Sequence, residues 1–447
     1  MTATSRTDSP LPVIGQSIPY ERFLDCVHCG LCTSACPTYV ETGDENNSPR
    51  GRIYLMRSVV DGRLPLTEKV QHHLDLCLDC RSCETACPSG VQYGRLIEPF
   101  RVETLQKEES QGTASTGDWF HRYILHGIFP DRKKTARALA PARWMQKLGV
   151  DRFARATGLT RLLPERLRTM QEQLPVLKTP LPELPTFLPA IGRKRADVAL
   201  FLGCVADAMF RHVHWATARV LQHNGCDVFI PEQQTCCGAI HYHSGAAEPA
   251  LERMTQNRAS FKLSMIDAII VNVAGCGAML KDYDHIAQEM SGHAGEHPES
   301  SEFCSKVKDI SEFLMELGPV HPAGEIDAVV AMQDACHLQH AQRIVKQPAD
   351  LLRMIPGIRL RSIAEAELCC GAAGTYNLTQ PEMADRLGRR KVEHLLEVQP
   401  DVIASANAGC SLQLQAKLRQ AGKEVPVLHP IELLDLSYRS LPLSAAH

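Results

Sequence analysis

Two runs of cysteine with the same spacing stand near the start of the chain. Cys26 and Cys77 each begin a run of the form Cys-x2-Cys-x2-Cys-x3-Cys-Pro. In such a run, three cysteines can wrap a tight loop around three corners of an iron-sulfur cubane, while the fourth points toward a second cluster. The repeated pattern therefore predicts two [4Fe-4S] clusters that exchange their fourth ligands. The predicted ligands are Cys26, Cys29, Cys32 and Cys87 for the first cluster, and Cys77, Cys80, Cys83 and Cys36 for the second.

Zinc and structural disulfides are the alternatives for these cysteines. Structural zinc sites usually combine two Cys-x2-Cys pairs separated by a dozen or more residues, and neither run has that form. Disulfide frameworks belong to small secreted domains. The spacing therefore favours iron-sulfur clusters. In this interpretation His28, inside the first run, is a bystander because the cysteines complete the ligand set.

A second group of cysteines occurs twice in the C-terminal half of the chain. Its two sets are Cys204, Cys236, Cys237 and Cys276, then Cys336, Cys369, Cys370 and Cys410. Corresponding cysteines are offset by 132, 133 and 134 residues, which indicates an internal duplication. Side chains alternate between the two faces of a strand, so two adjacent cysteines need a turn before both can face one metal. Gly238 and Gly371, which follow the two cysteine pairs, permit such a turn.

Each of these sets offers four thiols, which suffice to ligate an iron-sulfur cluster or zinc. We expect a further iron-sulfur cluster in one or both halves. The alternatives are zinc, a redox-active disulfide between adjacent cysteines, and buried structural thiols. His241, His243 and His337 are candidates for hydrogen bonds to sulfur or for proton transfer, against the alternative of ordinary packing. Tyr376 and Asn377 are candidates of the same kind.

The composition is that of a globular protein with two to four domains. The 447 residues are 44% hydrophobic and 22% charged, and the formal net charge of -3 predicts no nucleic-acid partner. The 18 cysteines fall mostly in metal-binding patterns, so we expect a reducing compartment, the cytoplasm. The N-terminus lacks the features of a signal peptide, and no apolar run is long enough to span a membrane. Any membrane association would be peripheral, on the inner face of the cell membrane.

Helical segments are predicted around and after the first cysteine group. Residues 51–60 have helical apolar spacing, and a second helix over 68–76 leads into the second run. Residues 119–170 contain twelve Lys or Arg and three Asp or Glu among apolar residues. Such a basic amphipathic region suits an anionic membrane surface or an acidic partner subunit, and the alternative is a set of solvated helices packed by their apolar faces. Five prolines over 175–189 then predict a stiff, extended linker.

From residue 196 onward, short apolar runs alternate with helical segments. Several runs lead to cysteines, which places thiols at the carboxyl edge of a parallel sheet, where α/β folds bind ligands. The predicted fold class is α + α/β, with an N-terminal α-helical two-cluster domain and two duplicated α/β domains. The expected divisions are a tail over 1–20, the cluster domain over 21–110, the basic segment and linker over 111–195, and cysteine-rich α/β domains over 196–320 and 321–447. Residues 284–309 are expected to form a polar connection, with Cys304 outside the duplicated pattern.

Several stretches together resemble a known family. The second cysteine group resembles the cysteine-rich domain of heterodisulfide reductase subunits, anaerobic glycerol-3-phosphate dehydrogenase and lactate-utilisation proteins. The whole arrangement, two ferredoxin motifs followed by two such domains, is more similar to the iron-sulfur subunit of bacterial glycolate oxidase, also called glycolate dehydrogenase. The stretches that carry the likeness are CVHCGLCTSACPTY, SPRGRIYLM, GCVADAMF, TCCGAIHYHSG, NVAGCGAMLKDY, DACHLQHAQRI and CCGAAGTYNLTQPEMA.

This resemblance implies an electron-transfer subunit without catalytic residues of its own. Separate FAD-binding subunits would oxidise glycolate to glyoxylate, and this chain would pass the electrons toward a quinone or another acceptor. No G-x-G-x-x-G stretch indicates a flavin or nicotinamide site in this chain. One departure matters, because complete cysteine-rich domains end in Cys-x-x-Cys, whereas Met279 and Gln413 take the last position here. That departure argues against heterodisulfide reduction.

Two other functions are compatible with the same residues. An equivalent subunit could serve a D-lactate or glycerol-3-phosphate dehydrogenase, because the partner subunit would select the substrate. A non-redox assembly module with structural clusters is the alternative from another class, although a two-cluster ligand arrangement argues against it.

Overall fold

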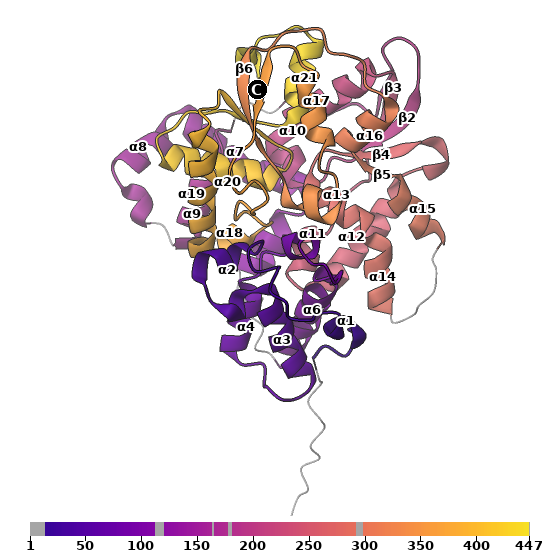
Figure 1. Ribbon diagram of the computed structural model, residues 1–447. Helices are drawn as coiled ribbons and strands as arrows, with labels where there is room; N and C mark the ends of the chain where they lie inside the picture. Colours follow the sequence, from indigo (N-terminus) through magenta and orange to yellow (C-terminus); the bar gives the residue numbers. More distant parts are fainter. Residues whose placement is uncertain (1–13, 112–119, 163–164, 178–180, 292–297, 447) are drawn as a thin grey trace, which may run out of the picture.

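The computed structural model describes residues 14–111, 120–162, 165–177, 181–291 and 298–446. Figure 1 shows an N-terminal helical part at the foot of the molecule, with two α/β units above it. The predicted fold class is confirmed, since helices alone build the first part and each unit has its own sheet.

The N-terminal part is built from short helices around the two cysteine runs. They are α1 (Glu21–Leu24), α2 (Pro37–Thr42), η1 (Glu45–Asn47), α3 (Pro49–Val60), α4 (Glu68–Asp75), α5 (Ser82–Thr85) and α6 (Gly94–Gln111). The helices predicted over 51–60 and 68–76 are confirmed as α3 and α4. Helix α3 begins earlier than predicted because the Ser48 side chain accepts a hydrogen bond from Gly51 and caps the helix. Of the expected tail, residues from Ile14 onward dock, with Ile14 and Ile18 buried.

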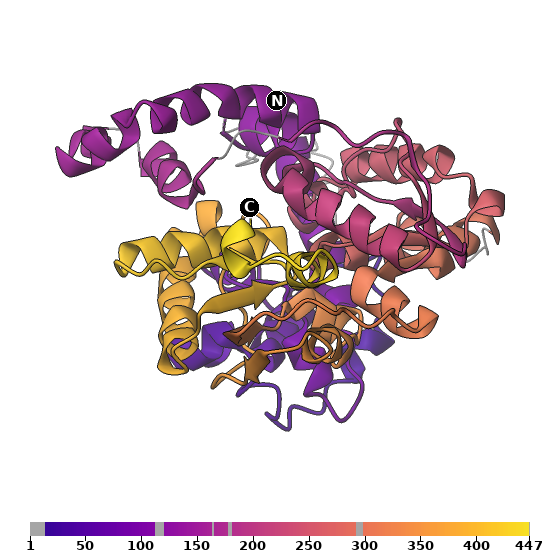
Figure 2. The ribbon, with the colours of Figure 1, turned by 90° about the horizontal axis from the view of Figure 1, so that it is seen from above.

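The basic segment is helical, as its sequence predicts. It contains η3 (Phe120–Ile128), α7 (Arg132–Lys147), α8 (Val150–Ala156), η4 (Leu159–Leu162) and α9 (Glu165–Gln173). Figure 2 shows α7 and α8 extending outward beside the α/β units, and we call these two helices the arm. The described part of the proline-rich stretch contains no helix, and its end forms the edge strand β1 (Phe187–Leu188). Pro180 lies outside the described residues.

The first α/β unit contains a five-stranded sheet. Strands β2 (Ala196–Leu200), β3 (Cys226–Phe229), β4 (Ala268–Val271) and β5 (Val307–Asp309) are parallel, and β1 is antiparallel, in the order β1-β3-β2-β4-β5. Its helices are α10 (Val205–His223), α11 (Ala239–His243), α12 (Ala247–Ser260), η5 (Leu263–Met265), α13 (Ala274–Lys281), α14 (Tyr283–Ser291), α15 (Pro298–Lys306) and α16 (Ile310–Leu317).

The second unit repeats this topology. Strands β6 (Ala328–Gln333), β7 (Ile358–Arg361), β8 (Val402–Ser405) and β9 (Val427–Leu428) are all parallel, in the order β7-β6-β8-β9. Its helices are η6 (His337–Ala341), α17 (Gln347–Arg353), α18 (Tyr376–Thr379), α19 (Pro381–Glu397), α20 (Ala408–Gln420), α21 (Pro430–Tyr438) and η7 (Leu443–Ala445). The order matches β3-β2-β4-β5 of the first sheet, which confirms the duplication inferred from the cysteine offsets.

The expectation that residues 284–309 form only a polar connection was wrong. The described part of this stretch contains most of α14, all of α15 and the edge strand β5. Ile286, Phe303 and Val307 are buried in the core of the first unit, so these apolar residues anchor the stretch to the sheet. Residues 292–297 lie outside the described residues.

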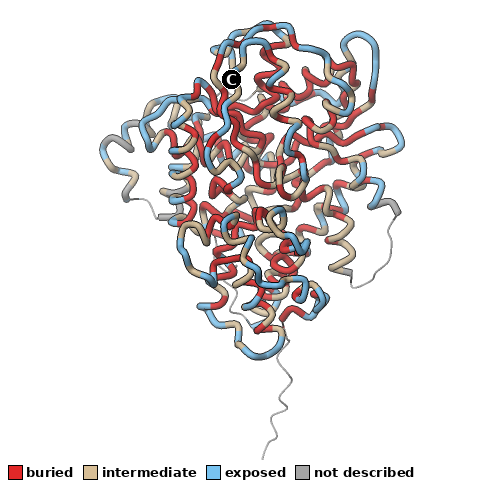
Figure 3. The backbone as a smooth tube through the Cα atoms, in the orientation of Figure 1, coloured by how far each residue is buried: buried red, intermediate tan, exposed pale blue. Residues whose placement is uncertain are grey.

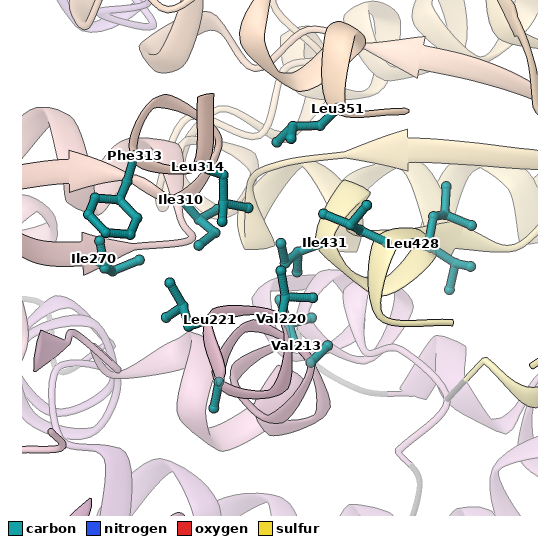
Figure 4. Packing of buried hydrophobic residues seen from close by; sticks show 14 of the residues in the cluster. Val213, Val220, Leu221, Ile270, Ile310, Phe313, Leu314, Leu351, Leu428 and Ile431 are labelled. Carbon is teal, nitrogen blue, oxygen red and sulfur yellow. The ribbon is translucent and has the colours of Figure 1, made fainter. Parts of the chain in front are cut away.

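A shared apolar core joins the two units. Figure 4 shows Val213 and Val220 of α10 facing Ile431 of α21, and Figure 3 shows buried backbone continuing between the units. Burying each such side chain contributes about 1.5–3 kcal/mol. The N-terminal part is tied to each unit by ion pairs: Arg22 binds Glu289 of α14 at 2.8 Å, and Glu41 binds Arg390 of α19 at 3.1 Å. These contacts hold the N-terminal part against a helix of each α/β unit.

Candidate iron-sulfur and thiol sites

The two N-terminal cysteine runs form the same loop twice. The backbone is left-handed directly before and directly after the second cysteine of each run. In the first run this occurs at His28 (φ 54°) and Gly30 (φ 88°), and in the second at Asp79 (φ 52°) and Arg81 (φ 59°). This conformation is unfavourable for residues other than glycine, so its recurrence shows that the surroundings hold both loops in one shape.

Each fourth cysteine lies near the other run. The Cys26 thiol interacts electrostatically with Cys29, Cys32 and Cys87. We call Cys26, Cys29, Cys32 and Cys87 the exposed set. The Cys80 thiol interacts electrostatically with Cys36 and Cys77. The Cys83 thiol interacts with Cys36, Cys77 and Cys80. We call Cys36, Cys77, Cys80 and Cys83 the buried set. The thiols of each set thus lie near one another, and Cys32 of the exposed set also interacts with Cys36 of the buried set, so the assignment of each set to one cluster stays a prediction.

The two sets differ in their exposure to solvent. Cys29 is exposed, and Val27 and Leu31 beside it are 67% and 59% exposed. Cys77 and Cys80 are each only 8% exposed. Burial raises the pKa of Cys32 to about 11 and raises the pKa values of Cys80 and Cys83 well above the usual thiol range. A metal that binds these thiolates must therefore displace their protons.

A buried guanidinium accompanies the buried set. Arg52 of α3 is 1% exposed, and it donates hydrogen bonds to the His73 carbonyl at 2.7 Å and to Thr38 Oγ1 at 3.0 Å. Its Nη1 lies 3.9 Å from Cys36 Sγ. Although burial lowers the pKa of Arg52, the thiolate charges of Cys77 and Cys36 hold that pKa above its usual value. No carboxylate in the described chain forms an ion pair with Arg52, so its charge faces the sulfur atoms.

The first α/β unit brings its four cysteines together. We call Cys204, Cys236, Cys237 and Cys276 the first thiol site. Cys204 Sγ lies 3.3 Å from Cys236 Sγ, and Cys237 Sγ lies 3.4 Å from Cys276 Sγ. The adjacent pair reaches both partners because Gly238 turns the chain with φ 89°. Cys204 is the N-cap of α10 and Cys276 lies in the first turn of α13, where the helix dipole stabilises a thiolate.

The second unit forms a corresponding group. We call Cys336, Cys369, Cys370 and Cys410 the second thiol site. Cys336 Sγ lies 4.0 Å from Cys369 Sγ, and Cys370 is hydrogen-bonded to Cys410. Gly371 has φ 82°, and Cys410 lies in the first turn of α20. Both duplicated groups therefore offer four convergent, mostly buried thiols, a donor set that fits iron-sulfur or zinc ligation.

Within the described residues, a thiol interaction with the N-terminal sets is seen at the second thiol site but not at the first. Cys80 of the buried set interacts electrostatically with Cys336, and the two belong to one apolar cluster. Tyr376 joins the second α/β unit to the N-terminal part at this point, since its hydroxyl donates a hydrogen bond to the Leu76 carbonyl at 3.0 Å. The two thiol sites are themselves linked through Asn407, which donates to Cys410 Sγ at 3.3 Å and accepts from the Gly275 N–H.

The candidate histidines occupy different positions. His337 Nδ1 lies 3.7 Å from Cys336 Sγ, and the charge of Cys236 acts on His241, which contacts the His126 carbonyl. His243 shows no sulfur neighbour among the described residues, and its Nδ1 lies 2.9 Å from Glu98 Oε1. Asn377 donates a hydrogen bond to Gln413 Oε1 at 3.4 Å.

The positions of the missing cysteines are filled by other contacts. Met279 is buried in the core of the first unit, and Gln413 donates a hydrogen bond to the Ala384 carbonyl at 2.8 Å. Both side chains are therefore part of the packing rather than open ligand positions.

Sequence reasoning missed a buried charge cluster beside the buried set. Asp79 and Glu98 are 3% and 1% exposed, and Arg81 binds Glu98 at 2.8 Å. Burial and the neighbouring Glu98 carboxylate raise the pKa of Asp79 well above its usual value. Although burial raises the pKa of Glu98, Arg81 and His243 hold it below the usual range. In the sequence, this cluster was indicated by nothing more than the position of the charged residues Asp79 and Arg81 inside a cysteine run.

Family models match most of the chain. Residues 22–91 match a model described as a 4Fe-4S dicluster domain, which implies two [4Fe-4S] clusters. Residues 198–281 and 330–415 each match a model of a cysteine-rich domain. Residues 116–174 match a model described as the linker region of the glycolate oxidase iron-sulfur subunit.

Known proteins from several bacteria are similar to the chain. The "Probable glycolate oxidase iron-sulfur subunit" of Bacillus subtilis (strain 168) is 38% identical, over 92% of this chain and 93% of that protein. The "Glycolate oxidase iron-sulfur subunit" of Escherichia coli (strain K12) is 34% identical over the same shares. "Lactate utilization protein A" of Geobacillus thermodenitrificans (strain NG80-2) is 29% identical over 53% of this chain and 98% of that protein. The family resemblance found in the sequence is thus confirmed.

Proposed function

Because the chain belongs to the family of glycolate oxidase iron-sulfur subunits, we propose that it carries electrons from a FAD-binding partner subunit toward a quinone or another acceptor. The partner would oxidise glycolate to glyoxylate. The observation that carries this proposal is the row of adjoining cysteine groups, from the exposed set through the buried set to the second thiol site.

The exposed set and the buried set are the proposed ligands of one [4Fe-4S] cluster each. Their convergence supports this assignment, as does the match to a dicluster model. A [4Fe-4S] cluster accepts and donates one electron at a time, which suits division of the two-electron output of a flavin. Cys29 and its apolar neighbours Val27 and Leu31 form the face that would meet the electron donor.

The second thiol site is the proposed position of a further iron-sulfur cluster, with zinc as the alternative ion. Its four thiols and its contact with Cys80 support a redox role. The first thiol site has an equivalent donor set but no thiol interaction with the N-terminal sets in the described chain. A cluster that exchanges electrons with the N-terminal clusters is therefore expected at the second thiol site rather than at the first.

Thiolate-rich sites suit a reducing compartment, so we place the protein in the cytoplasm, with a quinone acceptor approached from the inner face of the membrane. None of the described helices is long and apolar enough to cross a bilayer.

The proposal is tested by anaerobic co-purification of the tagged chain with its partner subunits, followed by electron paramagnetic resonance with and without glycolate. Reduced-cluster signals on addition of glycolate are expected, and integration of the spins gives the number of clusters. Absence of these signals, in a sample whose clusters dithionite does reduce, would overturn the glycolate assignment.

A second candidate donor is D-lactate, favoured by the similarity to lactate utilization protein A. The same preparation distinguishes glycolate from D-lactate, because only the physiological donor is expected to reduce the clusters rapidly after it is mixed with the complex. Glycerol-3-phosphate serves as a third substrate in the comparison.

A further inference from the structure

The arm exposes apolar side chains that the fold of this chain does not use. Trp144 and Phe153 are 67% and 64% exposed, and Met145, Leu148 and Val150 are also exposed. Isolated exposed apolar residues are common, but here five of them fall between residues 144 and 153, on α7, α8 and the turn between them. Gathered exposed apolar side chains of this kind are typical of surfaces that bind a membrane or another protein.

The opposite face of α7 holds the arm on the body. Thr135 and Leu139 are buried, and Arg143 donates to the Ala208 carbonyl of α10 at 2.9 Å. The Gln146 side chain donates to the Pro175 carbonyl at 3.0 Å and accepts from the Leu177 N–H at 2.7 Å. These residues recur at the spacing of one helix face, so Trp144 and Met145 are turned away from the body.

Basic residues continue the outer face toward the beginning of α7. Lys133, Lys134 and Arg137 are exposed, one helical turn or more before the apolar patch. Lys134 has a loose ion pair with Asp131 at 4.0 Å, whereas Lys133 and Arg137 form no ion pair within the described chain. The charges of Lys133 and Arg137 are therefore not neutralised by an ion pair in the part of the chain that the structure describes.

We propose that this outer face, from Lys133 to Phe153, binds the surface of an anionic membrane. Basic groups attract anionic headgroups, and Trp, Phe and Leu insert at the boundary between headgroups and acyl chains. The arm lies at the periphery, where a flat surface can reach it (Figure 2). This deepens the proposed function by naming the element that brings the subunit to a quinone-containing membrane, but lipid binding itself requires no electron transfer.

The test is co-sedimentation of the complete, cluster-loaded chain with vesicles of phosphatidylcholine alone or mixed with phosphatidylglycerol. Binding is expected only with the anionic lipid, and it should weaken as salt is raised. Each basic group at such a surface contributes about fivefold, so Lys133→Gln/Lys134→Gln/Arg137→Gln should weaken binding by about a hundredfold. Trp144→Ser/Phe153→Ser should weaken it at least about tenfold, because two large apolar side chains no longer insert.

A matched control keeps the result interpretable. Met265→Ser/Val345→Ser changes two exposed apolar residues away from the arm, at 57% and 53% exposure, and should leave vesicle binding unchanged. Iron content checks that each variant is loaded and folded. Equal binding of wild type and both arm variants, or no binding to anionic vesicles, would overturn the proposal. Loss of partner-subunit co-purification in the arm variants, with vesicle binding intact, would show a protein interface instead. Failure of vesicle binding alone would leave reduction of the clusters by glycolate unchanged, whereas loss of the partner subunit would abolish it.

Discussion

The exposed and buried cysteine sets use the same loop in two different environments. Both loops share the cysteine spacing and the left-handed positions around the second cysteine. The exposed set has Cys29 at the surface beside Val27, whereas the buried set packs against Cys336 of the second unit. The comparison teaches that the motif provides the ligands, while the surrounding elements decide which site meets a partner and which lies inside the molecule.

Helix α3 shows how one element treats the two sets differently. Arg50 and Arg52 are two residues apart, so they point to different sides of the helix. Arg50 donates to the His28 carbonyl in the loop of the exposed set and pairs with Glu45 at the surface. Arg52 is buried beside Cys36, and no carboxylate of the described residues forms an ion pair with it. A guanidinium thus accompanies each set, but only one of them is shielded from water.

The largest difference is expected when a ligand is removed from each set. Cys83→Ser should abolish the cluster of the buried set, about half of the N-terminal iron, and lower the thermal stability, because a buried site loses its metal. Cys29→Ser should remove a similar amount of iron with a smaller change in stability. Iron and sulfide analysis, together with thermal unfolding under anaerobic conditions, measures both. Equal losses of thermal stability in the two variants would contradict the expectation that the buried set contributes more to the stability of the fold.

Neutralising the buried guanidinium should change the reduction potential of one cluster. Arg52→Gln should lower the potential of the buried cluster by at least about 59 mV, a tenfold change in the one-electron equilibrium, because a positive charge that stabilises the reduced form is lost. Redox titration followed by electron paramagnetic resonance measures this shift.

Two variants serve as controls for the Arg52 experiment. Arg52→Lys keeps the charge and should retain most of the potential, which separates the electrostatic effect from lost hydrogen bonds. Arg50→Gln should shift the potential of the exposed cluster much less, because water screens that charge. A similar shift from Arg50→Gln would remove the distinction between the two sets.

Metal removal should proceed in a fixed order. An iron chelator added to the reduced, cluster-loaded chain should strip the exposed set first, because Cys29 is exposed whereas Cys77 and Cys80 are buried. The loss of each cluster's paramagnetic signal over time measures the order. Simultaneous loss would indicate that the two clusters unfold as one unit.

The smallest effect is expected at the junction with the second unit. Tyr376→Phe removes the hydrogen bond to the Leu76 carbonyl and should lower the free energy of unfolding by about 1 kcal/mol. Tyr54→Phe, at an exposed tyrosine, is the control and should have little effect. The midpoint of urea unfolding measures both, and equal midpoints for the two variants would show that the Tyr376 contact contributes nothing.

The sequence predicted the fold class and the duplication because these depend on spacing and periodicity, and the same spacing is the basis for the proposed grouping of the cysteines. It did not predict the burial of Arg52, since a charged residue in an amphipathic helix is ordinarily exposed. It also missed the cluster of Asp79 and Glu98, because the two residues meet only through packing of α6 against the second loop. The helices within 284–309 were missed because a few buried apolar residues stand among many polar ones.

The most direct test of the proposed order of sites is rapid mixing of the anaerobic complex with glycolate, with electron paramagnetic resonance of both clusters. In Cys29→Ser, the buried cluster should remain oxidised after glycolate is added, although dithionite reduces it. In Cys83→Ser, the exposed cluster should still be reduced by glycolate at the wild-type rate. Rapid reduction of the buried cluster in Cys29→Ser would contradict the account, because electrons would then enter without the exposed set.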